Sequence, residues 1–279
     1  MRQRNASMMI TSPANPLIKR IRALRQRKAR DETGLCCLEG IRLVAEAAQC
    51  GATIAQLVVA PALLSSAFAR TLVEAQAHAG VPVLEVSAEV FASFTQKDGP
   101  QGLAAIVAQR WFALADLHSA PPPGWVALVE PADPGNLGTI IRTADAVGAA
   151  GVIIVGPGAD PYDPAALRAS MGAAFALRLA RASWADFATW TKRTQSYVVG
   201  TSDQAPTDFQ AVAYPQPLVL LMGSERQGLS PDQQAHCDLL VSLPMRGQSD
   251  SLNLAVASGV MLYELLRHGG LEARAEGTN

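Results

Sequence analysis

Three polar segments, each at or near the end of an apolar run, hold the residues of this chain that could do chemistry. The richest is LPMRGQSDSLNLAVA, residues 243–257, where Ser249, Asp250, Ser251 and Asn253 precede an apolar helical stretch. A helix needs only one N-cap residue, and one of the first three can supply it. The excess of polar groups therefore indicates a surface that faces a ligand.

The second segment is EPADPGNLGTIIRTADAVGA, residues 130–149. Gly135 and Asn136 open a helix whose free N–H groups could face an anion. Arg142 stands among Ile140 and Ile141, and because a buried arginine normally has a partner, we expect one here. A structural interpretation stays open, with Asn136 as the N-cap and Arg142 on a solvated face.

The third segment is LLMGSERQGLS, residues 220–230. Gly223 directly after a strand allows close approach to a ligand, and Glu225 could balance a charge. Gly228 would serve the turn into a helix with Ser230 as N-cap and Pro231 at its first position. Turn chemistry explains this segment about as well as function does. A shorter segment, RASMGAAF, sets Arg168 beside a Gly-Ala turn.

The elements that must position these segments alternate between strands and helices, which predicts an α/β protein. WFALADLHSAPPPGW predicts a linker over 111–124 between domains 1–110 and 125–279. The first domain has predicted strands at 35–38, 56–60, 82–86 and 103–108. Its predicted helices lie near 15–29, 40–50, 62–79 and 87–95. The second has strands at 125–130, 151–156, 196–201 and 217–223 and helices near 135–148, 164–171, 184–194, 231–237 and 252–267. Its apolar strands are typical of a parallel sheet buried on both faces.

Composition excludes several classes of protein. No apolar run is long enough to span a membrane, and no apolar segment follows the basic N-terminus as in a secretory signal. The four cysteines lack zinc or CxxC spacing, so we expect a cytoplasmic, reduced and metal-free protein. There is no dinucleotide fingerprint, Walker loop, HExxH or GxSxG, so the four scattered histidines fit core or surface positions better than catalysis.

Charge is strongly asymmetric. The net charge is −1, yet residues 1–30 contain nine Lys and Arg and no acid, while the rest has 14 basic against 24 acidic residues. A basic arm on an acidic protein indicates a polyanionic partner such as nucleic acid. The alternative is a solvated helix face. The predicted RNA-contacting side chains are Lys19, Arg22, Arg25, Lys28 and Arg168.

Taken together, NLGTIIRTA, MGSERQGL and LPMRGQSDSLNLAVA resemble the three motifs of the SpoU (TrmH-like) family of RNA ribose 2′-O-methyltransferases, within the SPOUT superfamily. SPANPLIKRIRAL, LEGIRLVAEA and PQGLAAIV resemble the substrate-binding domain that many such enzymes carry in front. The resemblance implies a C-terminal parallel-sheet SPOUT domain with a deep trefoil knot, preceded by a small α/β RNA-binding domain. It also implies a homodimer.

The resemblance further implies S-adenosylmethionine as cofactor and assigns residues to the site. Those matching the cofactor positions are Gly223, Leu243 and Leu252, with Met222, Met245 and Thr201 nearby. Those matching the polar active-site positions are Asn136, Arg142, Glu225, Ser251 and Asn253. Because arginine is effectively never deprotonated, we expect Arg142 to clamp a phosphate and stabilise the developing alkoxide, while Ser251 and Asn253 orient the hydroxyl.

The expected function is methylation of a ribose 2′-oxygen in structured RNA. Ribosomal RNA is favoured over tRNA because the front domain resembles that of rRNA-directed members. Alternatives are a tRNA 2′-O-methyltransferase and a non-catalytic RNA-binding assembly factor of the same fold. A nucleotide-cofactor oxidoreductase lacks its fingerprint.

Overall fold

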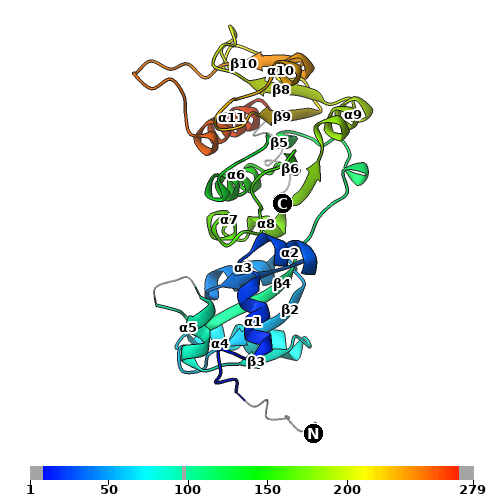
Figure 1. The fold of residues 1–279 in the computed structure, drawn as a ribbon. Coiled ribbons are helices and arrows are strands. Elements are labelled where there is room, and N and C mark those ends of the chain that lie inside the picture. Colours follow the sequence, from blue (N-terminus) through cyan, green and yellow to red (C-terminus); the bar gives the residue numbers. More distant parts are fainter. Residues whose placement is uncertain (1–8, 96–98, 270–279) are drawn as a thin grey trace, which may run out of the picture. The chain divides into compact units, whose positions relative to one another are not determined.

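The chain divides into two compact units in a computed structural model that describes residues 9–95 and 99–269 (Figure 1). The first unit comprises Met1–Gln109 together with Tyr162–Phe175, and the second comprises Arg110–Pro161 together with Ala176–Asn279. Arg2 and Arg4 of the basic arm lie outside the described residues. None of the helices within the described ranges is long and apolar enough to cross a membrane.

The first unit is built on a four-stranded mixed sheet of order β1-β4-β2-β3, in which only β2 and β3 are parallel. Its strands are β1 (Leu35–Glu39), β2 (Ile54–Val59), β3 (Val83–Glu85) and β4 (Leu103–Ala108). Its helices are α1 (Pro16–Ala23), α2 (Arg27–Thr33), α3 (Ile41–Gln49), α4 (Ala67–His78), α5 (Ala88–Phe94) and α7 (Pro164–Ser170), with α8 (Ala173–Ala176) at its boundary. All four strands predicted here are confirmed.

One predicted helix of this unit is wrong. The stretch 15–29 forms two helices, α1 and α2, because the chain turns over Leu24, Arg25 and Gln26. Arg30 is 1% exposed, and its guanidinium donates to the carbonyls of Leu24 at 3.1 Å and Arg25 at 2.8 Å. It also pairs with Asp163 at 3.3 Å. A buried cation that takes up these two carbonyls stabilises the break, which helical periodicity cannot reveal.

The second unit is built on a six-stranded sheet of order β10-β8-β9-β5-β6-β7, and every pair is parallel. Its strands are β5 (Trp125–Val129), β6 (Gly151–Val155), β7 (Arg178–Ala182), β8 (Tyr197–Thr201), β9 (Leu218–Met222) and β10 (Leu239–Val241). Its helices are η1 (Leu114–Asp116), α6 (Pro134–Ala146), α9 (Trp184–Thr194), α10 (Pro231–His236) and α11 (Leu254–His268). The predicted parallel sheet is confirmed.

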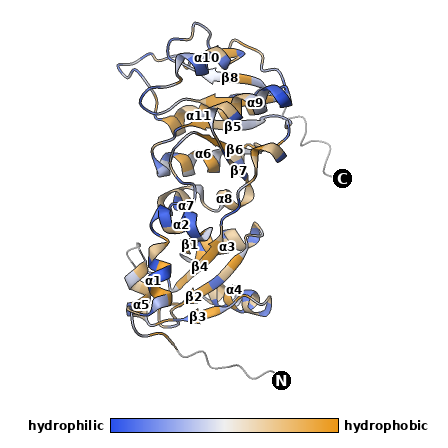
Figure 2. Ribbon diagram, turned by 45° about the vertical axis from the view of Figure 1, so that its right-hand side comes forward, coloured by the Kyte–Doolittle hydropathy of each residue, from blue (hydrophilic) through white to orange (hydrophobic). Residues whose placement is uncertain are grey.

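Sequence patterning missed β7 and β10, the two edge strands. In β7, arginines at 178 and 181 interrupt the apolar run, and β10 has only three residues. The four predicted strands form the middle of the sheet, where burial on both faces requires continuous apolar sequence. Figure 2 shows β5 and β6 mostly in orange, whereas α2 and α10 are mostly blue.

Alternate strand residues pack on opposite faces of this sheet. Trp125, Ala127 and Val129 of β5 share one core with Phe187 and Trp190 of α9. The rings of Trp125 and Trp190 meet edge to face at 6.0 Å. Helices α6 and α11 pack against each other away from α9 (Figure 1). The deep trefoil knot stays a prediction, because strand order alone does not define threading.

Candidate active site

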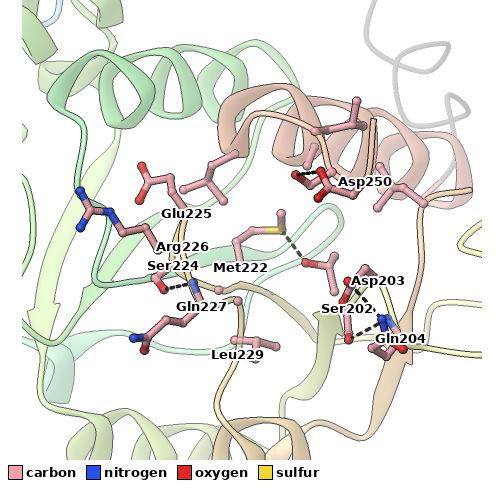
Figure 3. A pocket seen from close by; sticks show the side chains of 18 of the residues that line it. Ser202, Asp203, Gln204, Met222, Ser224, Glu225, Arg226, Gln227, Leu229 and Asp250 are labelled. Atoms are coloured by element: carbon pink, nitrogen blue, oxygen red, sulfur yellow. Dashed lines mark hydrogen bonds between the residues drawn. The ribbon is translucent and has the colours of Figure 1, made fainter. Parts of the chain in front are cut away.

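Two neighbouring cavities in the second unit lie where β8, β9 and β10 end, which is where parallel sheets present their ligand-binding loops. The larger encloses about 1410 Å³ of empty space, part of it open to solvent (Figure 3), and the smaller about 910 Å³. The smaller cavity is lined by Ala132, Asp133, Asn136, Glu225, Ser251, Leu252, Asn253 and Leu254. Glu225, Ser251, Leu252 and Leu254 line both, so the cavities share a wall.

The larger cavity gathers all six residues that the resemblance assigned to the cofactor: Thr201, Met222, Gly223, Leu243, Met245 and Leu252. Met222 is 1% exposed, and the Thr201 hydroxyl donates to its thioether sulfur at 3.7 Å (Figure 3). A Cβ on Gly223 would lie 2.2 Å from the carbonyl carbon of Gly228. Only glycine fits there, so the loop after β9 can fold back tightly.

Glu225 is the centre of a hydrogen-bond network at the smaller cavity. Its carboxylate accepts from the backbone N–H of Ala132 at 2.9 Å and of Asp133 at 3.4 Å, and from the Asn136 side chain at 3.5 Å. Asn253 Nδ2 donates to Asn136 Oδ1 at 3.0 Å. The structure thus joins Glu225, Asn136 and Asn253, which lie on three separate sequence motifs.

The helix caps differ from those expected. Asn253 itself is the N-cap of α11, since its Oδ1 accepts from the N–H groups of Ala255 and Val256. The expectation that Ser249, Asp250 or Ser251 caps this helix is wrong. Asp133 caps α6 by accepting from the Asn136 N–H at 2.7 Å, so the alternative of Asn136 as N-cap is wrong as well. Ser230 does cap α10, with Pro231 at its first position.

Sequence reasoning missed Asp133, although it stands next to Pro134 at the first position of α6. An Asp–Pro pair before a helical pattern is a capping signal, and it could have placed Asp133 in the site. It also missed Ser202, Asp203 and Gln204, which line the larger cavity from the loop after β8. That loop has no distinctive motif, so only the sheet order reveals its place.

Ser251 reaches both cavities and is bonded to its neighbour. Its hydroxyl donates to Asp250 Oδ1 at 3.2 Å, and both side chains are exposed to solvent (Figure 3). The segment from Leu243 to Leu252 projects beyond the rest of this unit between β10 and α11, drawn in orange in Figure 1. The Ser251 hydroxyl therefore lies at the junction of the two cavities.

Arg142 is not buried, which corrects the expectation drawn from its apolar neighbours. It is exposed on α6 and lines neither cavity. At about 100° per residue, it lies about 120° around the helix from Asn136. Thr139 and Ala146, also exposed, share its face. The expected partner is not found for Arg142 within the described ranges.

The side chains predicted to contact RNA divide into two groups. Lys19, Lys28 and Arg168 are exposed, and Lys28 lies 3.9 Å from Glu32. Arg22 and Arg25 are half-buried: Arg22 donates to the Ser93 hydroxyl at 2.9 Å, and Arg25 to the Thr95 carbonyl at 2.7 Å. These two arginines hold α1 to the α5 region, so a structural role competes with RNA contact.

Thiolate chemistry does not fit Cys37 or Cys237. Burial raises the pKa of both Cys37 and Cys237 to about 12, so these thiols stay protonated near neutral pH. Across the described ranges no cluster of three or more His, Cys, Asp or Glu side chains could hold a metal ion.

A profile of the SpoU rRNA Methylase family matches residues 124–263, which is the part of the chain that contains both cavities. The chain belongs to the SpoU rRNA methylase family. A second profile, the MRM3-like substrate binding domain, matches residues 15–105 of this SpoU-family chain. The two matches follow the division seen in the sequence motifs.

Individual relatives and solved structures agree with this family assignment. The chain is 41% identical over 143 residues to the 23S rRNA (uridine(2479)-2'-O)-methyltransferase of Streptomyces viridochromogenes. The matched stretch covers 49% of this chain and 50% of that protein. The 23S rRNA (guanosine(2553)-2'-O)-methyltransferase RlmP of Bacillus subtilis is 28% identical over 92% of this chain and 98% of its own. An AdoMet-bound rRNA methyltransferase from Sinorhizobium meliloti superposes with a TM-score of 0.85 at 41% identity, covering 94% and 98% of the two chains.

Proposed function

We propose that this chain transfers a methyl group from S-adenosylmethionine to a ribose 2′-oxygen in ribosomal RNA. The observation that carries the proposal is the network of Glu225, Asn136 and Asn253 beside the larger cavity. Relatives whose names specify 23S rRNA 2′-O-methylation support the same substrate class. An enzyme that acts on ribosomal RNA would work in the cytoplasm.

The larger cavity fits S-adenosylmethionine in size and chemistry. About 540 Å³ of its space is accessible to water-sized groups, which is within the range typical of cofactor pockets. Leu243, Leu252 and the buried Met222 offer apolar surface for an adenine ring, while the loops after β8 and β9 offer backbone polar groups. When bound, the cofactor supplies an electrophilic methyl group on a sulfonium sulfur.

The residues of the smaller cavity hold the acceptor ribose in this proposal. Methyl transfer is an in-line displacement, so much of the catalysis consists of aligning the 2′-oxygen with the methyl group. Asn136 is held by Glu225 on one side and Asn253 on the other, and it keeps one amide hydrogen for the ribose. Ser251 faces the same space and can orient the hydroxyl.

A homodimer would bring Arg142 into this arrangement. Helix α11 exposes Val256 (53%), Val260 (38%) and Tyr263 (58%) in one stripe at i, i+4 and i+7. Helix α6 packs against α11 and presents Arg142 on its own exposed face. We propose that this stripe forms the dimer interface and that Arg142 of one copy binds a phosphate of the RNA at the site of the other copy.

The first unit would select the RNA. Its match to a substrate binding domain supports this role, and Lys19, Lys28 and Arg168 are its exposed predicted contacts. Phosphate contacts position an RNA without reading its sequence, so site choice rests on RNA shape.

The test is methylation by the full chain. Purified protein, tritiated S-adenosylmethionine and ribosomal RNA from a strain lacking the gene should give label that maps to a single ribose 2′-oxygen. Calorimetric titration with S-adenosylmethionine comes first. If the cofactor does not bind while RNA does, the chain is a non-catalytic RNA-binding factor and the proposal fails. Label in tRNA alone would contradict the substrate class.

A further inference from the structure

We propose that Ser251 and Asp250 form a relay that removes the proton of the ribose 2′-hydroxyl, with the Asp250 carboxylate as its final acceptor. This inference rests on the proposed function. A 2′-hydroxyl is a weak acid, and the reaction produces one proton for each methyl group transferred. Arginine cannot take that proton, because its guanidinium is effectively always protonated. A carboxylate reached through a hydroxyl can.

The location of Ser251 favours it as the first member. Ser251 lines both cavities, so its Oγ stands between the proposed cofactor pocket and the proposed ribose pocket. Its hydrogen already points to Asp250 Oδ1 at 3.2 Å (Figure 3). The lone pairs of Oγ are thus turned away from Asp250 and are available to a hydroxyl in the smaller cavity.

The other carboxylates that line the cavities are engaged elsewhere. Glu225 accepts from two backbone N–H groups and the Asn136 amide. Asp133 accepts from the Asn136 backbone N–H as the cap of α6, and Asp203 accepts from Gln204 Nε2 at 3.2 Å. Protonating any of them would weaken a bond to an N–H donor. Of the four carboxylates of the described residues that line the cavities, Asp250 bonds a hydroxyl, which can deliver a proton.

The step balances as follows. The 2′-oxygen forms a bond to the methyl carbon while the carbon–sulfur bond breaks. The electron pair of the broken carbon–sulfur bond stays on sulfur, which leaves a neutral thioether. The 2′-hydroxyl proton passes to Ser251 Oγ as the Ser251 proton passes to Asp250 Oδ1. Asp250 becomes a neutral carboxylic acid. Because its side chain is exposed, it returns the proton to water before the next turnover.

The pH profile of single-turnover methylation tests the relay. A carboxylate relay needs no hydroxide from solvent, so the wild-type rate at saturating cofactor and RNA should change little between about pH 6 and 9. Asp250→Asn should lower the rate about 100-fold at neutral pH. Hydroxide then becomes the base, so the rate of the variant should rise about tenfold per pH unit. Ser251→Ala should show the same slope, and Asp250→Glu should recover part of the flat profile.

Controls separate the relay from other roles. Asp232→Asn removes an exposed carboxylate on α10 and should behave as wild type. The thermal stability of Asp250→Asn should match wild type, because this side chain is exposed. S-adenosylmethionine affinity is measured separately for the variant, because Asp250 lines the larger cavity. A flat profile in Asp250→Asn, or a rate loss fully explained by weaker cofactor binding, overturns the relay. A wild-type protein that methylates no RNA overturns the proposed function instead.

Discussion

Arg142 lines neither of the two cavities of its own chain, so its contribution can be separated from theirs. If it stabilises charge electrostatically, Arg142→Lys should keep measurable single-turnover methylation. Arg142→Ala should lose 10²–10³-fold, roughly the effect of removing one preorganised donor. Both variants should keep wild-type S-adenosylmethionine affinity by calorimetry. Equal losses in the two variants would argue against a purely electrostatic role.

Glu225 is expected to act by holding the loop before α6. In Glu225→Gln an amide N–H replaces one carboxylate oxygen and faces an N–H donor of Ala132 or Asp133. Losing these bonds should lower the free energy of unfolding by about 1–2 kcal/mol, and methylation should fall with the displacement of Asn136. Denaturant unfolding and single-turnover kinetics measure the two effects. Wild-type values in both would show that the network has no role.

At the scale of elements, the face of α11 is the feature most open to test. Tyr263→Asp places a charge within the exposed apolar stripe, at its C-terminal end, where a second copy would have to desolvate it. We expect a monomer by analytical ultracentrifugation and a loss of methylation, with a folded circular-dichroism spectrum. Arg178→Asp on edge strand β7 is the matched exposed substitution and should stay dimeric. A Tyr263→Asp dimer with full activity would move the interface elsewhere.

Mixed dimers test whether Arg142 acts across the interface. If the chain forms a homodimer, Arg142→Ala and Glu225→Gln should each damage both sites of their own dimer. A heterodimer would combine an intact Arg142 from one copy with an intact Glu225 from the other at one of its sites. Unfolding and refolding the two variants together should therefore restore methylation that neither has alone. No recovery would place Arg142 and Glu225 of one chain in the same site.

The central strands of the second unit followed directly from sequence, because burial on both faces demands apolar runs. Strand β7 did not, since arginines at 178 and 181 break its pattern at the sheet edge. Local periodicity also could not reveal the break between α1 and α2, which depends on Arg30 and the distant Asp163. Long-range contacts decide such features, and one sequence does not contain them.

The sequence predicted which residues form the candidate site better than it predicted what each of them does there. Three motifs named Asn136, Glu225 and Asn253, and the structure joins them. The role of Asn253 as N-cap was missed because three nearer polar residues competed for it. The exposure of Arg142 was hidden by its apolar neighbours, although helical geometry already separates it from Asn136.

At the scale of the whole molecule, the basic arm should dominate the salt dependence of RNA binding. Many of its described cations have protein partners: Arg22 and Arg25 donate to the α5 region, and Arg30 pairs with Asp163. Charge reversal should therefore be made at Lys19 and Lys28, which are exposed. We expect weaker binding and a log–log salt slope that falls by about 0.7–0.9 for each phosphate contact removed. Filter binding at several salt concentrations measures this slope. An unchanged slope would indicate that Lys19 and Lys28 do not contact RNA and that α1 and α2 have a purely structural role.

All four tryptophans, at 111, 125, 184 and 190, belong to the second unit, and Trp125 and Trp190 lie in its core. Tryptophan fluorescence therefore reports the unfolding of the second unit alone, whereas far-ultraviolet circular dichroism reports the secondary structure of both units. If the units melt together, the two signals should give one superimposable transition. If they melt separately, S-adenosylmethionine should shift the fluorescence transition upward and leave the other dichroism transition in place. The native protein thus carries its own optical label for the part that would bind the cofactor.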